Sequence, residues 1–429
     1  MYEEITAGLM SFIKKSPTPF HAVENIGGIL RENGFQRLEE SGKWEVRPGG
    51  KYYVTRNDSS IIAWRTGEEL EEGYRFKVAA SHSDSPTFKI KENAELTVKD
   101  KYMKLNTEGY GGMLCAAWFD RPLSVAGRAV IKENNGYTTR LINIDRDLLM
   151  IPNMAIHMNR EINEGYAYNR QTDMLPLFGG SGCKKGDFKK LIADELGVAE
   201  EEIYGTELYL YNRMKPSVWG ADNEYISCPQ LDDLQCAYTS LKGFLSGADK
   251  HAVNVYACFD NEEVGSGTKQ GAASTFLADV LYRINLSLKK DEEEFYRAAA
   301  LSFMISCDNA HAVHPNHPNK TDQENCVYMN EGIVIKSHAG QKYTSDAVSI
   351  AIFRGICKEA GVPVQFFANR SDMAGGSTLG NIAMSQVSMD CVDIGLPQLA
   401  MHSCYETAGV KDSCYMVKAM EKFFGDGAF

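Results

Sequence analysis

Positive charge is in deficit along this chain. Lys and Arg together number 45 against 57 Asp and Glu, which gives a formal net charge of -12. No basic cluster is longer than the pairs Lys184–Lys185 and Lys189–Lys190. Because nucleic-acid phosphates need a basic stripe on the protein, the composition argues against nucleic acid as a partner.

Long hydrophobic runs are also missing. No apolar run reaches the roughly 18 residues that a membrane-spanning helix needs, so we expect no membrane partner. The first residues, Met1–Glu4, are acidic and precede an amphipathic segment instead of a long apolar one. We therefore expect no secretory signal here.

Cysteine is present, but the spacings that would give it a structural role are not. The 11 cysteines are an odd number, run from Cys115 to Cys414 and form no Cys-x-x-Cys pair. Several of them, such as Cys258 and Cys307, lie inside apolar runs. This usage predicts reduced, buried thiols in a cytoplasmic protein and argues against a zinc–thiolate site.

The rest of the composition is that of a globular α/β protein. The chain has 429 residues, of which 44% are hydrophobic and 10% aromatic, with 38 glycines. That length allows at least two domains, each with a core of its own.

The first part of the chain predicts one helix and three strands. Thr18-Pro19 precedes an apolar stripe that extends to Leu30 and is typical of an amphipathic helix. Short β-prone runs follow at 52–54, 60–64 and 76–80. From about Asn93 to Tyr225 the pattern changes to short strand-like pieces separated by many turns, which predicts an inserted second domain.

After Pro229 strands and helices alternate, and we interpret this part as parallel α/β. A helix is expected over 231–245 and a closing helix after Asp412. Strands are expected at 252–259, 298–306, 362–367 and 386–391.

Acid and imidazole residues stand out in this pattern, most of them at the ends of apolar runs. The set comprises His82, Asp84, Asp232, Glu262, Glu263, Asp308 and His402. In open α/β sheets the loops that follow the strands carry the functional site. The pattern therefore predicts that these distant side chains converge on one pocket.

Each local motif also allows a purely structural interpretation. In an extended segment the side chains of His82 and Asp84 lie on the same side, so Asp84 can orient an imidazole that binds a metal. The structural alternative is that the two side chains form a hydrogen bond at the end of a strand. Asp232 lies at the start of a predicted helix and could be a ligand or an N-cap. The adjacent Asp233 competes for either role.

The adjacent Glu262 and Glu263 follow an apolar strand and precede a glycine turn. Because neighbouring side chains point different ways, one carboxylate can bind a metal while the other takes a proton from water, although a surface pair is the alternative. Asp308 and His402 could each be a satisfied core group instead of a ligand. We interpret three further histidines as loop residues near the site: His311, His314 and His317.

The whole set fits a two-metal hydrolase site. Two divalent ions roughly 3.5 to 4 Å apart need a bridging carboxylate and about two further ligands each. The set supplies these ligands and leaves one glutamate as a base. Mixed nitrogen and oxygen ligands without thiolate favour zinc, with manganese or cobalt as alternatives.

At these residues the sequence resembles the aspartyl aminopeptidase family of metallo-aminopeptidases, over nearly the whole chain. The matching stretches before the predicted insert ends are Ser16-Pro-Thr-Pro-Phe-His-Ala-Val23, Ser81-His-Ser-Asp-Ser-Pro86, Thr107-Glu-Gly-Tyr-Gly-Gly112, Trp118-Phe-Asp-Arg121 and Ile151-Pro-Asn-Met-Ala-Ile-His157. The later ones are Pro229-Gln-Leu-Asp-Asp-Leu234, Asp260-Asn-Glu-Glu-Val-Gly-Ser266, Asp308-Asn-Ala-His-Ala-Val-His-Pro-Asn316, Asn369-Arg-Ser-Asp-Met373, Gly375-Gly-Ser-Thr378 and Met401-His-Ser403.

The resemblance implies an α/β fold of two parts. Residues 1–93 and 226–429 would form a zinc-peptidase-type catalytic domain, with a central mixed sheet flanked by helices. Residues 94–225 would form an inserted β-rich dimerisation and lid domain. Family members are homo-oligomers, dodecamers built from dimers, in which a histidine matching His157 reaches the active site of a neighbouring subunit.

The resemblance also implies a role for each site residue. His82 and Asp308 would bind one zinc ion, Glu263 and His402 the other, and Asp232 would bridge the two. Glu262 would be the general base, and Asp84 would support His82. The implied reaction removes N-terminal residues from peptide substrates by attack of a metal-activated water.

A preference for acidic N-terminal residues would need a fixed cation in the pocket. Lys336, with Tyr343 beyond it, matches the family stretch close to that pocket, although lysine is commonly just solvated. Departures from the family at Gln230, Asp233 and Ala374 leave the preference open. The alternatives are a broad or hydrophobic-preferring aminopeptidase, a carboxypeptidase-type dimetal enzyme, and a non-catalytic scaffold.

Overall fold

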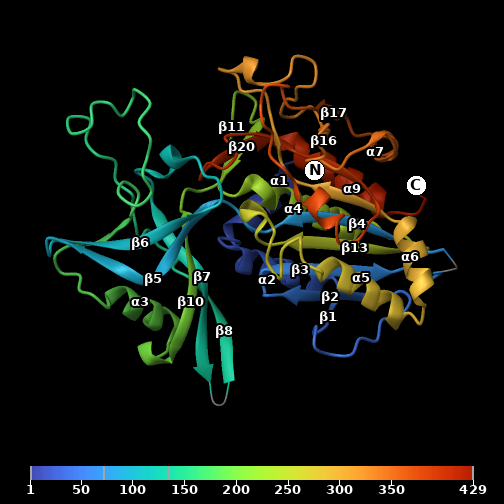
Figure 1. The fold of residues 1–429 in the computed structure, drawn as a ribbon, viewed down its shortest axis with the longest axis horizontal. Coiled ribbons are helices and arrows are strands. Elements are labelled where there is room, and N and C mark those ends of the chain that lie inside the picture. Colours follow the sequence, from blue (N-terminus) through green and yellow to red (C-terminus); the bar gives the residue numbers. More distant parts are fainter. Residues whose placement is uncertain (1, 71–72, 134–135, 428–429) are drawn as a thin grey trace. The chain divides into compact units, whose positions relative to one another are not determined.

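The computed structural model describes residues 2–70, 73–133 and 136–427 (Figure 1). The chain divides into two compact units. Unit 1 comprises Met1–Asp84, Pro216–Met401 and Glu406–Phe429, and unit 2 comprises Ser85–Lys215 with His402–Tyr405. No helix among the described residues is long and apolar enough to cross a membrane.

These boundaries differ from the predicted insert at 94–225. Strand β5 (Thr87–Val98) begins three residues after Asp84 and pairs with β6 (Tyr102–Tyr110), so its first residues belong to the sheet of unit 2. At the other end, β11 (Ser217–Trp219) pairs with β12 (Tyr225–Cys228), which pairs with a strand of unit 1. The role of unit 2 in dimerisation or as a lid stays a prediction.

A nine-stranded sheet forms the centre of unit 1, in the order β1-β2-β3-β13-β4-β14-β18-β16-β17. Its strands are β1 (Gln36–Arg37), β2 (Lys51–Arg56), β3 (Ser60–Thr66), β4 (Arg75–His82), β13 (Ala252–Phe259), β14 (Phe303–Cys307), β16 (Ile333–Lys336), β17 (Val364–Phe367) and β18 (Asp390–Gly395). The four middle strands, β13, β4, β14 and β18, pair in parallel. Strand β3 runs antiparallel to β13, and β16 antiparallel to β18. The sheet is therefore mixed, as the family resemblance implied, although the parallel pattern read from the C-terminal sequence does not extend to β16.

Helices cover both faces of this sheet (Figure 1). One apolar core contains residues of α1 (Tyr2–Lys14), α2 (Pro19–Glu32), α4 (Leu231–Ser246), α7 (Ala347–Ala360) and α9 (Val410–Phe424). The other contains residues of α5 (Phe276–Ser287), α6 (Glu292–Ala300) and α8 (Leu379–Ala383). Strand β13 contributes Tyr256 to the first core and Val255 to the second, because successive side chains of a strand point to opposite faces.

Two of the predicted strands were misplaced. The expected strand at 298–306 is in fact the end of α6 followed by β14, which begins at Phe303. Phe295, Ala298 and Ala299 are buried at helical spacing, and Asp291 caps α6, so the alanines belong to the helix. Likewise β18 begins at Asp390, later than the predicted 386. Short apolar runs do not separate helix from strand.

A five-stranded sheet completes unit 1, in the order β11-β12-β20-β19-β15. Its remaining strands are β15 (Ala310–His311), β19 (Pro397–Leu399) and β20 (Glu406–Gly409). Short 3-10 turns lie at Glu262–Val264 and Pro318–Lys320.

Unit 2 is built on a six-stranded antiparallel sheet in the order β8-β7-β10-β5-β6-β9, with helix α3 (Asp187–Leu196). The other strands are β7 (Leu123–Glu133), β8 (Gly136–Asn143), β9 (Leu177–Gly179) and β10 (Ile203–Asn212), and 3-10 turns lie at Cys115–Trp118 and Glu200–Glu202.

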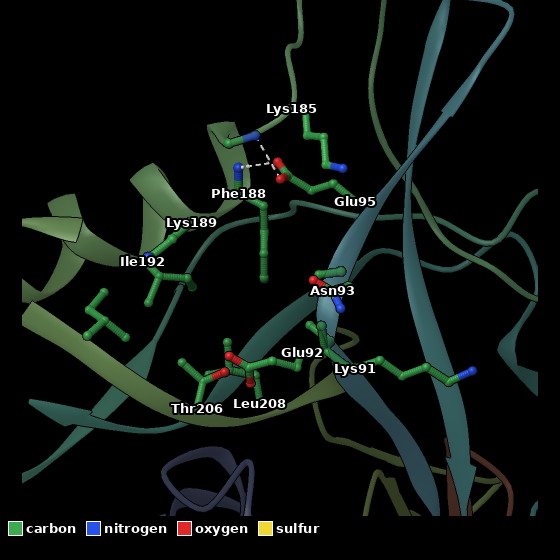
Figure 2. Close-up of a pocket in the computed structure, with 14 residues that line it drawn as sticks. Lys91, Glu92, Asn93, Glu95, Lys185, Phe188, Lys189, Ile192, Thr206 and Leu208 are labelled. Atoms are coloured by element: carbon green, nitrogen blue, oxygen red, sulfur yellow. Dashed lines mark hydrogen bonds between the residues drawn. The ribbon is translucent and has the colours of Figure 1, made fainter. Parts of the chain in front are cut away.

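A cavity of about 470 Å³ lies in unit 2 between β5, β10 and α3 (Figure 2). It borders an irregular stretch of β5, where the register with β6 shifts between Ile90 and Glu95. Glu95 accepts hydrogen bonds from the backbone N–H groups of Gly186 and Phe188, at 2.7 and 2.8 Å, and so holds the start of α3 (Figure 2). None of the predicted site residues lines this cavity.

A buried ion pair in unit 1 joins β4 to the loop between α4 and β13. The Lys77 ammonium of β4 lies 2.5 Å from the carboxylate of Asp249, with both side chains less than 10% exposed. Lys77 also donates to the backbone carbonyl of Gly425, at 2.8 Å. Burial by itself raises the pKa of Asp249, but the hydrogen bond from Lys77 outweighs it and holds that pKa below its usual value.

We expect Asp249→Asn to lower the free energy of unfolding by about 3 to 5 kcal/mol, because it leaves a buried ammonium without its counter-charge. Because the pKa of Asp249 is lower in the folded protein than in the unfolded chain, its carboxylate stabilises the fold at pH values above the unfolded pKa of about 4. This stabilisation is lost as the pH falls further. Urea unfolding at pH 7 and pH 3 would measure both effects. Glu69→Gln is the control, because it breaks an exposed pair with Lys250 and should cost under about 1 kcal/mol. Equal losses for the two variants would contradict the expectation.

Candidate metal centre

Several predicted site residues of unit 1 lie at the ends of three neighbouring strands. Strand β4 lies between β13 and β14, and all three run in parallel, so their carboxyl ends share one edge of the sheet. His82 ends β4, Glu262 and Glu263 follow β13, and Asp308 follows β14. Parallel pairing therefore brings together residues that are far apart in the sequence.

These side chains form two overlapping groups of potential metal ligands. His82, Asp232, Asp233 and Asp308 each offer one ligand atom, and these atoms lie within 4.8 Å of one another. The same holds for His82, Glu262 and Glu263. His82 Nε2 lies 3.4 Å from Asp232 Oδ1 and 3.9 Å from Asp308 Oδ1. Residues of the first group are all buried, with at most 8% of any one exposed.

Asp84 has a larger part in this geometry than the sequence indicated. Its two carboxylate oxygens accept hydrogen bonds from the backbone N–H groups of Glu262 and Glu263, each at 3.1 Å. The backbone carbonyl of Asp84 lies 3.0 Å from His82 Nδ1. A carbonyl can only accept, so Nδ1 carries the proton and Nε2 is left as the nitrogen for a cation.

Helix α4 brings two aspartates to the cluster. Asp232 and Asp233 have non-helical backbone angles, which interrupt this helix in its first turn. The backbone N–H of Asp232 donates to Glu406, and Asp233 accepts from the backbone N–H of His82, both at 3.0 Å. The peptide bond between Asp232 and Asp233 is cis.

Electrostatic crowding is the main property of the cluster. Burial raises the pKa of Glu262 to about 8, and the carboxylates of Asp308 and Asp84 add to the shift. Burial likewise raises the pKa of Asp308 to about 6, although Lys336 opposes it. The pKa values of Asp233 and Glu263 are raised in the same way. Buried carboxylates at this density need a positive counter-charge.

The donor set fits a divalent cation of the zinc type. It offers one imidazole nitrogen and several carboxylate oxygens, and neither group contains a thiolate. Mixed nitrogen and oxygen donors suit zinc, manganese or cobalt. Among the described residues, no such group includes His311, His314 or His317.

Lys336 lies at the edge of the cluster and is not a solvated lysine. Its side chain is buried, and its ammonium donates to the backbone carbonyl of Asn309 at 2.7 Å. It lies 3.8 Å from Asp308 Oδ2 and 5.5 Å from the ring centre of Tyr343. Burial alone lowers the pKa of Lys336, but the Asp308 carboxylate and Tyr343 raise it overall, so the group stays charged.

Two predicted site residues belong to unit 2. His402 Nδ1 lies 2.6 Å from the backbone carbonyl of Gly112. His157 lies in an exposed turn. Their roles as a ligand and as a substrate-binding residue stay predictions.

Comparison with known proteins identifies the family. Residues 12–424 match the family model described as aminopeptidase I zinc metalloprotease (M18). A protein of Clostridium acetobutylicum named a probable M18 family aminopeptidase 2 is 48% identical over 426 residues, 98% of each chain. The solved structure of the Ape4 and Nbr1 complex matches with a TM-score of 0.95 at 34% identity, over 99% of this chain and 86% of that one. The S. cerevisiae mApe1 dodecamer matches with a TM-score of 0.86 at 25% identity, over 99% and 97% of the two chains.

The family match confirms the resemblance found in the sequence motifs. It also accords with a buried group of imidazole and carboxylate donors at the carboxyl edge of a mixed α/β sheet. This chain belongs to the M18 family of zinc metalloaminopeptidases and is a hydrolase.

Proposed function

We propose that this protein is a two-metal aminopeptidase that removes N-terminal residues from peptides and prefers acidic ones. The observation that carries the proposal is the gathering of one buried imidazole and five acidic side chains, in two groups that share His82, at the ends of three parallel strands and the start of α4. Zinc is the first choice of metal, with manganese or cobalt as alternatives.

The ligand assignment follows the family pattern. His82 and Asp308 would hold one cation, Glu263 and His402 the second, and Asp232 would lie between them. When bound, such cations polarise the scissile carbonyl and lower the pKa of a water molecule. The residues of the chain supply the remaining steps.

Glu262 is placed to act as the general base. Its carboxylate lies in the cluster, and burial raises its pKa to about 8, which makes the ionised group a stronger base than an ordinary glutamate. It would take the proton of the attacking water and pass it to the leaving amine. Asp84 would hold the backbone of Glu262 and Glu263 in place during these transfers.

Two substitutions separate proton transfer from cation binding. We expect Glu262→Gln to lower kcat by about 100- to 10,000-fold while cation binding persists, because it removes the base and keeps the proposed ligands. Asp232→Ala should weaken cation binding as well as turnover. Peptidase assays and zinc titration of the metal-free protein would measure both. Wild-type rates in Glu262→Gln would show that another group is the base, and a wild-type protein that binds no divalent cation would refute the metal site.

The acidic preference is assigned to Lys336, with Tyr343 packed against it. The ammonium is fixed by Asn309 and lies beside the cluster, where it could pair with an acidic substrate side chain. A local cation is needed because the net charge of -12 opposes the approach of an acidic peptide.

Aminoacyl-anilides of Asp, Glu and Leu would test this preference. We expect the wild type to show its highest kcat/KM with Asp or Glu. Lys336→Met should lower the ratio of Asp to Leu turnover by about 10- to 100-fold, because the variant loses a hydrogen bond to a charged group, and the free energy of such a bond corresponds to this factor. Lys342→Met is the matched control, because that lysine is exposed and donates to Gly375. A wild type that prefers Leu would favour the broad aminopeptidase, and one that cleaves none of the three would favour a carboxypeptidase or a scaffold.

We further propose a homo-oligomer, a dodecamer built from dimers, in which His157 of one copy reaches the active site of a neighbour. The match to a dodecameric relative supports the assembly, and the exposure of His157 leaves it available to another copy.

A cytoplasmic location fits the free cysteines, and cell fractionation would check it.

Native mass measurement combined with His157→Ala would test the assembly. We expect a mass near that of twelve chains for both proteins, and a lower kcat/KM for the variant, because only the contribution to the neighbouring site is lost. An active monomer, or a variant with full activity, would contradict this arrangement.

A further inference from the structure

A network of buried amide side chains lies next to the acid cluster. Gln235, Asn309 and Gln398 are each at most 2% exposed. Asn309 Nδ2 donates to the side-chain carbonyls of both Gln235 and Gln398, at 3.0 Å each. Asn309 Oδ1 accepts from the thiol of Cys236 at 2.9 Å. The amide of Asn309 therefore uses two donor hydrogens and its acceptor at once.

This network joins elements that carry the proposed metal ligands. Asn309 follows Asp308 directly, after the end of β14. Gln235 and Cys236 lie on α4 about one turn after Asp232 and Asp233, and the amide of Gln235 continues to the hydroxyl of Ser413 in α9 at 3.0 Å. The side chain of Asn309 thus ties the Asp308 strand end to the helix that bears the two aspartates.

The main chain of the same residue holds Lys336. The backbone carbonyl of Asn309 accepts from the Lys336 ammonium at 2.7 Å. Gly395 of β18 packs against this point so closely that a Cβ there would lie 2.0 Å from the Asp308 carbonyl and 3.0 Å from Lys336 Cε. Neither Asp308 nor Lys336 has room to shift toward β18.

We propose that Asn309 is a positioning residue that sets the spacing between Asp308, the aspartates of α4 and Lys336. The inference rests on the proposed function and extends it to a residue that has no direct role in the chemistry. Only an amide satisfies all three partners: a carboxylate lacks the two donors, and an apolar side chain leaves buried polar groups unpaired. Residues that orient metal ligands contribute to metal affinity because they fix ligand geometry in advance.

The test compares Asn309→Leu with Asn285→Leu in the full-length protein. Asn285 is an equally buried amide, which donates to the carbonyls of Lys290 and Asp291 and accepts from the Tyr74 hydroxyl. Both variants lose three hydrogen bonds from a buried amide, so a purely structural role predicts similar losses of stability and no difference in cation affinity. We expect Asn309→Leu to weaken Zn²⁺ affinity about 10- to 100-fold, and Asn285→Leu to leave it unchanged. Zinc titration of metal-free protein against a chromophoric chelator would measure this.

A second readout uses the link to Lys336. The ratio of kcat/KM for Asp-anilide over Leu-anilide should fall in Asn309→Leu and stay constant in Asn285→Leu. If Asn309→Leu does not fold, Gln398→Leu removes a single hydrogen bond of Asn309 and should show a smaller shift in the same direction. If folded Asn309→Leu or Gln398→Leu binds zinc as tightly as the wild type, the inference about Asn309 is overturned and the proposed function is not affected. A wild type without zinc affinity would overturn the proposed function and this inference with it.

Discussion

The candidate site depends on one electrostatic constraint, the burial of several carboxylates around a single imidazole. His82, Asp232, Asp233 and Asp308 are almost fully covered, and their ligand atoms lie within 4.8 Å of one another. Crowded anions of this kind are costly to bury unless a counter-charge is present, which is why burial raises the pKa values of Glu262 and Asp308. Lys336 supplies one positive charge, and the negative charge that it leaves unbalanced is what a cation site requires.

The sheet topology makes this constraint possible. Strand β4 lies between β13 and β14 in parallel register, so three polar turns meet at one edge. The two apolar cores on either face of the sheet hold the strands and helices in place. Hydrogen bonds then set the finer positions: Asp84 holds the turn of Glu262 and Glu263, and Asn309 connects Asp308 to α4.

Much of the fold was predictable because its signals are local. The helix after Thr18 begins at Pro19, and the buried run at Ala252–Phe259 forms the strand expected there. The errors came where local signals are ambiguous. The alanines before Ser302 fit a strand or a helix equally well, and only the buried spacing and the Asp291 cap of α6 decided for the helix. The start of unit 2 at Ser85 also differs from the predicted start of the insert at residue 94, because the pairing of β5 with β6 does not follow from the composition of the segment.

The sequence by itself determined the family, and it predicted which residues carry the chemistry, because ligand types at the ends of apolar runs can be recognised without knowing their positions in space. Only the tertiary structure decided which atoms of Asp84 hold His82 and the glutamates, whether Lys336 is solvated or buried, and where Asn309 places its amide. The physical reason is that hydrogen bonds and burial depend on distances between segments far apart in the chain, and no local pattern encodes those distances.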